Sequence, residues 1–180
     1  GVSVQTYEDT EYNLIKTHIR VLNQEGAKRL GKPIGNYITL ESNRLSSDDE
    51  DIHMPCVLAL HEVLRELLKG AKRVFVIGLG NRNITPDALG PSVVDHLYIT
   101  RHLLREGVVY NSMEISALCP GVMAQTGIET STIIQSLCSE VDPDVVICID
   151  ALAAREAERL NTTIQVCDTG ITPGAGVGNR

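Results

Sequence analysis

Three aspartates of this chain stand at or just beyond the ends of apolar segments whose composition predicts β-strands. Asp87 lies in a loop that follows one such segment, and Asp150 and Asp168 directly follow two others. In a parallel sheet the carboxyl ends of the strands share one edge, where ligands bind and chemistry takes place. We therefore expect the three carboxylates to lie on one edge of the sheet, although they are far apart in the sequence.

Paired carboxylates can perform acid–base chemistry that a single carboxylate cannot. Two that lie close together cannot both ionise at low cost, so the pair shares a proton near neutral pH. One can then activate a water molecule while the other protonates a carbonyl oxygen or a leaving group. Three carboxylates could instead bind a metal ion, or each could cap a helix. The residues by themselves leave these alternatives open.

The elements that must position these aspartates alternate between strand and helix. Apolar runs predict the strands, and helical periodicity of the apolar residues predicts the helices. The expected strands are 73–77, 112–118, 144–149 and 162–167, and the expected helices are about 88–105, 127–139 and 151–160. This alternation is typical of an α/β fold with a largely parallel sheet and helices on both faces.

The first part of the chain has a different pattern. Loose alternation of apolar and polar residues predicts strands there, with a short helix between the second and the third. The expected strands are 2–8, 14–22 and 36–41, the short helix is 25–30, and a longer helix is expected at 55–68. We predict a small β-rich N-terminal extension, residues 1–45, followed by an α/β core, residues 46–180.

Two loops at the predicted edge have the composition of a substrate groove. The first reads GLGNRNITPDALGP, in which glycines and Asn81 permit a tight turn. It does not meet the GxGxxG pattern of a dinucleotide site, because Asn83 takes the place of the third glycine. The second loop contains Pro120, Gly121 and Gly127. We expect these three residues and Asn81 to line the groove.

Composition limits the classes of partner. A net charge of −7 argues against a nucleic-acid surface, which would need a basic stripe. No apolar run is long enough to span a membrane. The five cysteines include no CxxC and no zinc-type spacing with histidine, which is typical of reduced thiols in a cytosolic protein. We expect no cofactor, no metal, no membrane and no direct nucleic-acid contact.

Long strings in the chain resemble the germination protease family of spore-forming bacteria. The strings occur in the family's order along most of the chain. They are EGAKRLGK (25–32), YITLES (37–42), GLGNRNITPDALGP (78–91), ITRHL (99–103), PGVMAQTGIETS (120–131), IDALAAR (149–155), NTTIQVCDTGI (161–171) and PGAGVGNR (173–180).

The resemblance implies an atypical aspartic endopeptidase that degrades small acid-soluble spore proteins during germination. It implies a three-layer αβα fold like that of hydrogenase-maturation peptidases. The family's catalytic aspartates match Asp87 in TPDALGP and Asp150 in IDALAAR, which leaves Asp168 as a supporting candidate. The resemblance also implies a zymogen, a homotetramer, and a location in the spore core, which is cytoplasmic.

The family continues well beyond the last of these strings. We therefore expect residues 46–180 to be a peptidase core that is truncated at its C-terminal side. The hypothesis is an endopeptidase in which Asp87 and Asp150 jointly activate water. The alternatives are a metal-dependent peptidase that uses the same carboxylates and a non-catalytic fragment that binds a partner.

Overall fold

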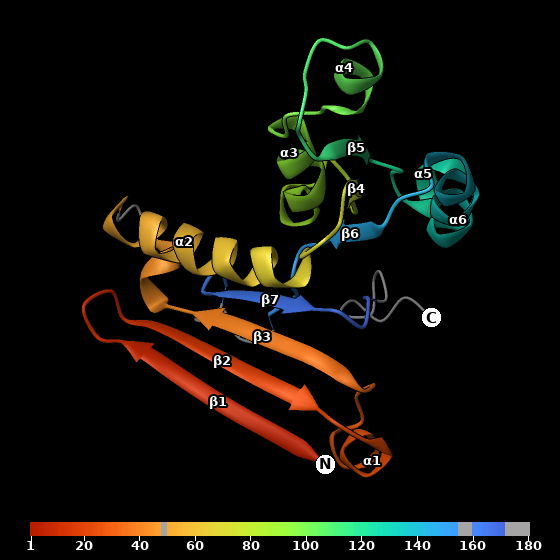
Figure 1. The fold of residues 1–180 in the computed structure, drawn as a ribbon. Coiled ribbons are helices and arrows are strands. Elements are labelled where there is room, and N and C mark those ends of the chain that lie inside the picture. The colour runs from red at the N-terminus through yellow and green to blue at the C-terminus, as the bar shows by residue number, and fades with distance from the viewer. Residues whose placement is uncertain (48–49, 155–159, 172–180) are drawn as a thin grey trace. The chain divides into compact units, whose positions relative to one another are not determined.

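The computed structural model describes residues 1–47, 50–154 and 160–171. The chain forms two compact units (Figure 1). The first consists of residues 1–69 and 152–180, and the second of residues 70–151. Among the described helices, none is long and apolar enough to cross a lipid bilayer.

The first unit contains a four-stranded antiparallel sheet in the order β1-β2-β3-β7 (Figure 1). Its strands are β1 (Val2–Asp9), β2 (Leu14–Val21), β3 (Gly35–Glu41) and β7 (Thr163–Cys167). The strand β7 therefore joins the sheet from the far end of the described chain, and Tyr37 of β3 lies opposite Cys167.

Three helical segments complete this unit. They are α1 (Gln24–Leu30), the 3₁₀ turn η1 (Asn43–Ser46) and α2 (Glu50–Leu67). The helix α2 contributes Ile52 and Cys56 to a core cluster that also contains Leu14 of β2 and Leu40 of β3. Burying this apolar surface is what holds α2 against the sheet.

The second unit contains a three-stranded parallel sheet in the order β5-β4-β6 (Figure 1). Its strands are β4 (Arg73–Gly78), β5 (Glu114–Leu118) and β6 (Val145–Ile149). The central strand β4 is almost entirely buried and apolar, as expected for a parallel strand that is covered on both faces. In register, Gly78 lies opposite Ile149.

Helices flank this parallel sheet. They are the 3₁₀ turn η2 (Thr85–Asp87), α3 (Leu89–Asp95), α4 (Arg101–Arg105), α5 (Met123–Thr126) and α6 (Thr130–Val141). Phe75 and Ile77, on one face of β4, form a core cluster with Leu79 and with apolar side chains of α6. Successive residues of a strand point to opposite faces, so Gly78 faces the other side, where α3 lies against it.

Glycines allow α3 to approach the sheet closely. A Cβ added at Gly90 would lie 2.4 Å from the carbonyl oxygen of Leu79 and 2.5 Å from that of Ile149. A Cβ added at Gly78 would lie 2.4 Å from the carbonyl oxygen of Gly90. The two glycines therefore set the distance between α3 and the ends of β4 and β6.

The predicted mixture of helices and strands is confirmed, with two corrections. The strand at 162–167 was expected in the parallel sheet, but β7 pairs antiparallel with β3. The helix expected at 88–105 is divided into α3 and α4. Its division has a local cause, because buried Thr100 donates to Met113 O and accepts from the N–H of Ile115 instead of continuing a helix.

Two further predictions concern the helix after β6 and the boundary between the parts of the chain. Of the helix expected at 151–160, residues 155–159 lie outside the described residues, and residues 151–154 and 160 are not helical. The division into an extension (1–45) and a core (46–180) stays a prediction, since the two units are defined by contacts in space rather than by a single boundary.

Candidate active site

The carboxyl ends of β4 and β6 bring two of the three predicted aspartates to one edge. The parallel pairing continues one step past the strands, because the N–H of Leu79 donates to the carbonyl oxygen of Ile149 at 2.8 Å. Asp150 follows that carbonyl directly, and the loop that contains Asp87 begins at Leu79. The sheet therefore positions both carboxylates from adjacent strands of the same unit.

Asp87 is oriented by a loop that folds back on itself. It ends the turn η2, and its Oδ2 accepts a hydrogen bond from the backbone N–H of Asn81 at 2.7 Å. Gly80 makes this possible, since it has a φ of +107° and a Cβ there would lie 2.1 Å from Asp87 O. Only glycine fits both the conformation and the space.

Asp150 is half-buried, and its environment opposes ionisation. Burial raises the pKa of its carboxyl, the N–H of Ala151 donates to Oδ1 at 2.9 Å and lowers it, and the negative charge of Asp87 raises it further. The electrostatic contribution from Asp87 means that the two carboxylates influence each other.

This arrangement suits general acid–base chemistry. The carboxyl of Asp150 favours its protonated form more than an ordinary aspartate does. The carboxylate of Asp87 keeps its Oδ2 aligned by a backbone donor. Activating water for attack on a carbonyl carbon requires one group that can donate a proton and another that can accept one.

The four predicted groove residues have distinct local roles. The side-chain oxygen of Asn81 accepts from the N–H of Asn83 and from Nε2 of Gln125, each at 3.0 Å. Pro120 is buried and lies two residues beyond the end of β5, and Gly121 has a φ of +74°. Gly127 ends α5 in the left-handed conformation, with its N–H donating to Met123 O. Contact with a substrate stays a prediction for all four.

Asp168 belongs to the other unit. It follows β7 in the antiparallel sheet of the first unit, so the reason for grouping it with the other two aspartates no longer holds. Its Oδ1 accepts from the N–H of Asn36 at 2.7 Å, and its Oδ2 accepts from Nδ2 of Asn36 at 2.6 Å. These bonds join the end of β7 to the start of β3.

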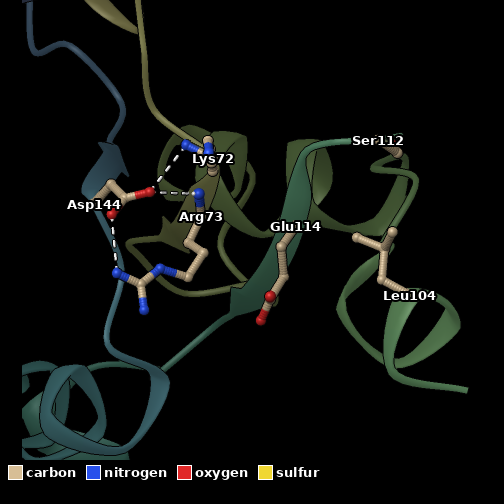
Figure 2. A pocket seen from close by; sticks show the side chains of 6 residues that line it. All are labelled: Lys72, Arg73, Leu104, Ser112, Glu114 and Asp144. Carbon is tan, nitrogen blue, oxygen red and sulfur yellow. Dashed lines mark hydrogen bonds and ion pairs between the residues drawn. The ribbon is translucent and has the colours of Figure 1, made fainter. Parts of the chain in front are cut away.

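A hollow of about 460 Å³ occurs at the opposite, amino edge of the parallel sheet (Figure 2). It is lined by Lys72, Arg73, Leu104, Ser112, Glu114 and Asp144. The carboxylate of Asp144 accepts from the N–H of Lys72 at 2.9 Å, from the N–H of Arg73 at 2.8 Å and from the guanidinium of Arg73 at 2.9 Å. The guanidinium and these two N–H donors lower the pKa of Asp144 to about 2.

The chemistry at this amino edge is that of a structural ion pair. The carboxylate of Asp144 accepts hydrogen bonds from three donors. The hollow lies at the other end of the strands from Asp87 and Asp150. We therefore place the candidate active site at the carboxyl edge. Within residues 1–47, 50–154 and 160–171, no three His, Cys, Asp or Glu side chains are grouped so that they could hold a metal ion.

One residue at the carboxyl edge was missed by the sequence reasoning. Gln125 of α5 links the loop after β5 to Asn81 in the loop after β4. Nothing in the spacing of PGVMAQTG distinguishes this glutamine from an ordinary exposed helix residue. Its contact depends on how two loops fold against each other, which has no periodic signature.

Comparison with known proteins leads to the same family as the sequence strings. The family described as germination protease (peptidase A25) matches residues 1–180. Curated germination proteases are similar to the chain over its whole length or nearly so. That of Caldanaerobacter subterraneus is 46% identical over 185 residues, covering 100% of this chain and 56% of the relative. That of Clostridium tetani is 43% identical, covering 100% and 57%.

The germination protease of Bacillus subtilis is 42% identical over 181 residues, covering 96% of this chain and 49% of the relative. The chain thus spans about half the length of these curated relatives. The match nevertheless extends over every described element of both units. The chain belongs to the germination protease family.

Proposed function

We propose that the protein containing this chain is an endopeptidase that initiates the degradation of small acid-soluble spore proteins during germination. Asp87 and Asp150 jointly activate the attacking water. The observation that carries this proposal is that the two aspartates follow adjacent parallel strands at one edge of the sheet. The raised pKa of the half-buried Asp150, to which the charge of Asp87 contributes, supports it. Family membership supports the reaction class.

The different surroundings of the two carboxylates suggest a division of roles. Asp150 has a raised pKa and acts as the acid, donating a hydrogen bond to the scissile carbonyl oxygen. Asp87 acts as the base and takes a proton from water while the water oxygen bonds to the carbonyl carbon. When the C–N bond breaks, the leaving amine takes a proton from the pair. Both carboxyl groups end in their starting charge state.

Substitution of each aspartate by asparagine tests this proposal. We expect Asp87→Asn and Asp150→Asn each to lower turnover on a purified small acid-soluble spore protein by about 100-fold or more, since each removes a proton-transfer group. The measurement is the rate of substrate cleavage, followed by mass spectrometry of the fragments. The variants should retain the circular dichroism spectrum of the parent.

Asp142→Asn is the matched control, because Asp142 is an exposed aspartate at the amino edge of the same unit. It should retain nearly full turnover. Full activity in either Asp87→Asn or Asp150→Asn would exclude the carboxylate pair. Loss of activity with a chelator and its return with a divalent ion would favour a metal-dependent peptidase instead.

The remaining family features are proposals of the same kind. We infer a zymogen that assembles as a homotetramer and works in the spore core, since these properties accompany the family resemblance described above. Light scattering of the purified protein tests the oligomeric state. A shift in electrophoretic mobility as spores form and germinate tests the processing.

A further inference from the structure

We propose that Gln125 is a positioning residue that holds Asp87 in its reactive orientation through Asn81. This inference rests on the proposed function, because it concerns the same catalytic edge. It goes beyond that function in assigning a role to the loop after β5.

The first step is the contact between Asn81 and Asp87. The backbone N–H of Asn81 donates to Oδ2 of Asp87 at 2.7 Å, and it is the donor that fixes this side chain's orientation. The direction of a backbone N–H is set by the loop conformation around it. Whatever fixes the loop at Asn81 therefore also fixes the donor to Asp87.

The second step is what holds Asn81. Its side-chain oxygen accepts from the N–H of Asn83 and from Nε2 of Gln125, each at 3.0 Å. An amide oxygen has two lone pairs, so these two donors use its full accepting capacity. The Asn83 contact is internal to the loop, whereas the Gln125 contact ties the loop to a different element, the helix α5.

The third step is the anchor of Gln125 itself. Its Oε1 lies 3.5 Å from the N–H of Val122 at the start of α5. A Cβ at Gly121 would lie 3.0 Å from that same Oε1, so the glycine leaves the side chain its space. Gln125 is therefore held from the loop after β5 while it donates to the loop after β4.

The test is Gln125→Met, which keeps a side chain of similar length but has no donor. We expect kcat to fall by roughly 2- to 10-fold with KM unchanged, because one hydrogen bond is lost and no substrate contact is removed. Gln125→Ala should give the same result and serves if the methionine variant does not fold. Gln135→Met is the matched control, an exposed glutamine on α6.

Two further readouts separate positioning from a merely structural role. Combining Asn81→Ala with Gln125→Met should lower kcat no more than Asn81→Ala alone, since both act through one contact. In Gln125→Met, the backbone amide hydrogen of Asn81 should exchange with solvent several-fold faster, whereas amides of β4 should not. The exchange experiment does not depend on activity.

An unchanged kcat in Gln125→Met, or a raised KM with kcat unchanged, would overturn the inference; the second result would make Gln125 a substrate contact. Fully additive effects in the double variant would also overturn it. Failure of the proposed function has a different signature, namely full activity in Asp87→Asn. The two failures can therefore be told apart within the same set of variants.

Discussion

In the proposed mechanism, the raised pKa of Asp150 serves catalysis at a cost to stability. Its raised pKa, caused first by burial, means that the folded chain binds the proton more tightly than the unfolded chain does. A group of this kind adds stability at pH values below its unfolded pKa and loses that contribution as the pH rises through its folded pKa. Above the ordinary aspartate range the folded protein is therefore less stable than it would be with a neutral group of the same shape at this position.

Asp150→Asn should for this reason be more stable than the parent protein at neutral pH, although we expect it to have lost activity. The difference should shrink as the pH falls through the folded pKa and disappear below the ordinary aspartate range, where the parent carboxyl is protonated in both states. Calorimetric melting temperatures over a pH series measure this. A lower melting temperature for the variant at neutral pH would contradict it.

The residue scale also shows where sequence reasoning succeeds. Asp87 and Asp150 could be placed because each follows a strongly apolar strand, and parallel strands share an edge. Gln125 could not be placed, because its role depends on one side-chain contact between two loops. The strand before Asp168 was predicted correctly but its partner was not, because β7 pairs with β3. The supporting role of Asp168 stays a prediction.

At the scale of elements, β4 and β7 show how far the residues of a strand can predict its neighbours in the sheet. The run RVFVIG is buried and apolar after its first residue, and a parallel position with two covered faces is the environment that fits it. The run TIQVC has only modest apolar content, with Gln165 exposed. Such a strand suits an antiparallel edge equally well, so its partner is decided by the rest of the fold.

The contact of α3 with the sheet provides a test at this scale. Gly90→Ala should destabilise the protein by about 1–3 kcal/mol or more, because the added methyl group would lie within 2.5 Å of the backbone of Leu79 and Ile149. Chemical denaturation measures the loss. Because Leu79 begins the loop that contains Asp87 and Ile149 directly precedes Asp150, we expect activity to fall as well.

Ser92→Ala is the control for this substitution, since Ser92 is exposed on the same helix. It should change the free energy of unfolding by only a few tenths of a kcal/mol, as is usual for surface positions. If Gly90→Ala were as stable as Ser92→Ala, the close approach of α3 would not be a requirement of the fold.

At the scale of the whole molecule, the two units differ in how many segments of the chain form them. The second is one continuous segment, residues 70–151, whereas the first combines residues 1–69 with residues 152–180. Asp87 and Asp150 both belong to the continuous segment, so the geometry of the pair is set within a single unit. The first unit depends on a pairing between distant parts of the sequence, β3 with β7.

Asp168 joins the end of β7 to the start of β3 by two hydrogen bonds to Asn36. Its substitution tests whether the role of this residue is structural or catalytic. Asp168→Ala removes both hydrogen bonds to Asn36 and should cost about 1 kcal/mol. We expect faster amide hydrogen exchange in β3 and β7, with the exchange of the amides that pair β4 with β6 unchanged.

Turnover of Asp168→Ala, measured below the melting transition, should fall by less than in Asp87→Asn, because this carboxylate belongs to the other sheet. A loss of turnover equal to that of Asp87→Asn, with exchange unchanged in β3 and β7, would instead make Asp168 part of the catalytic machinery.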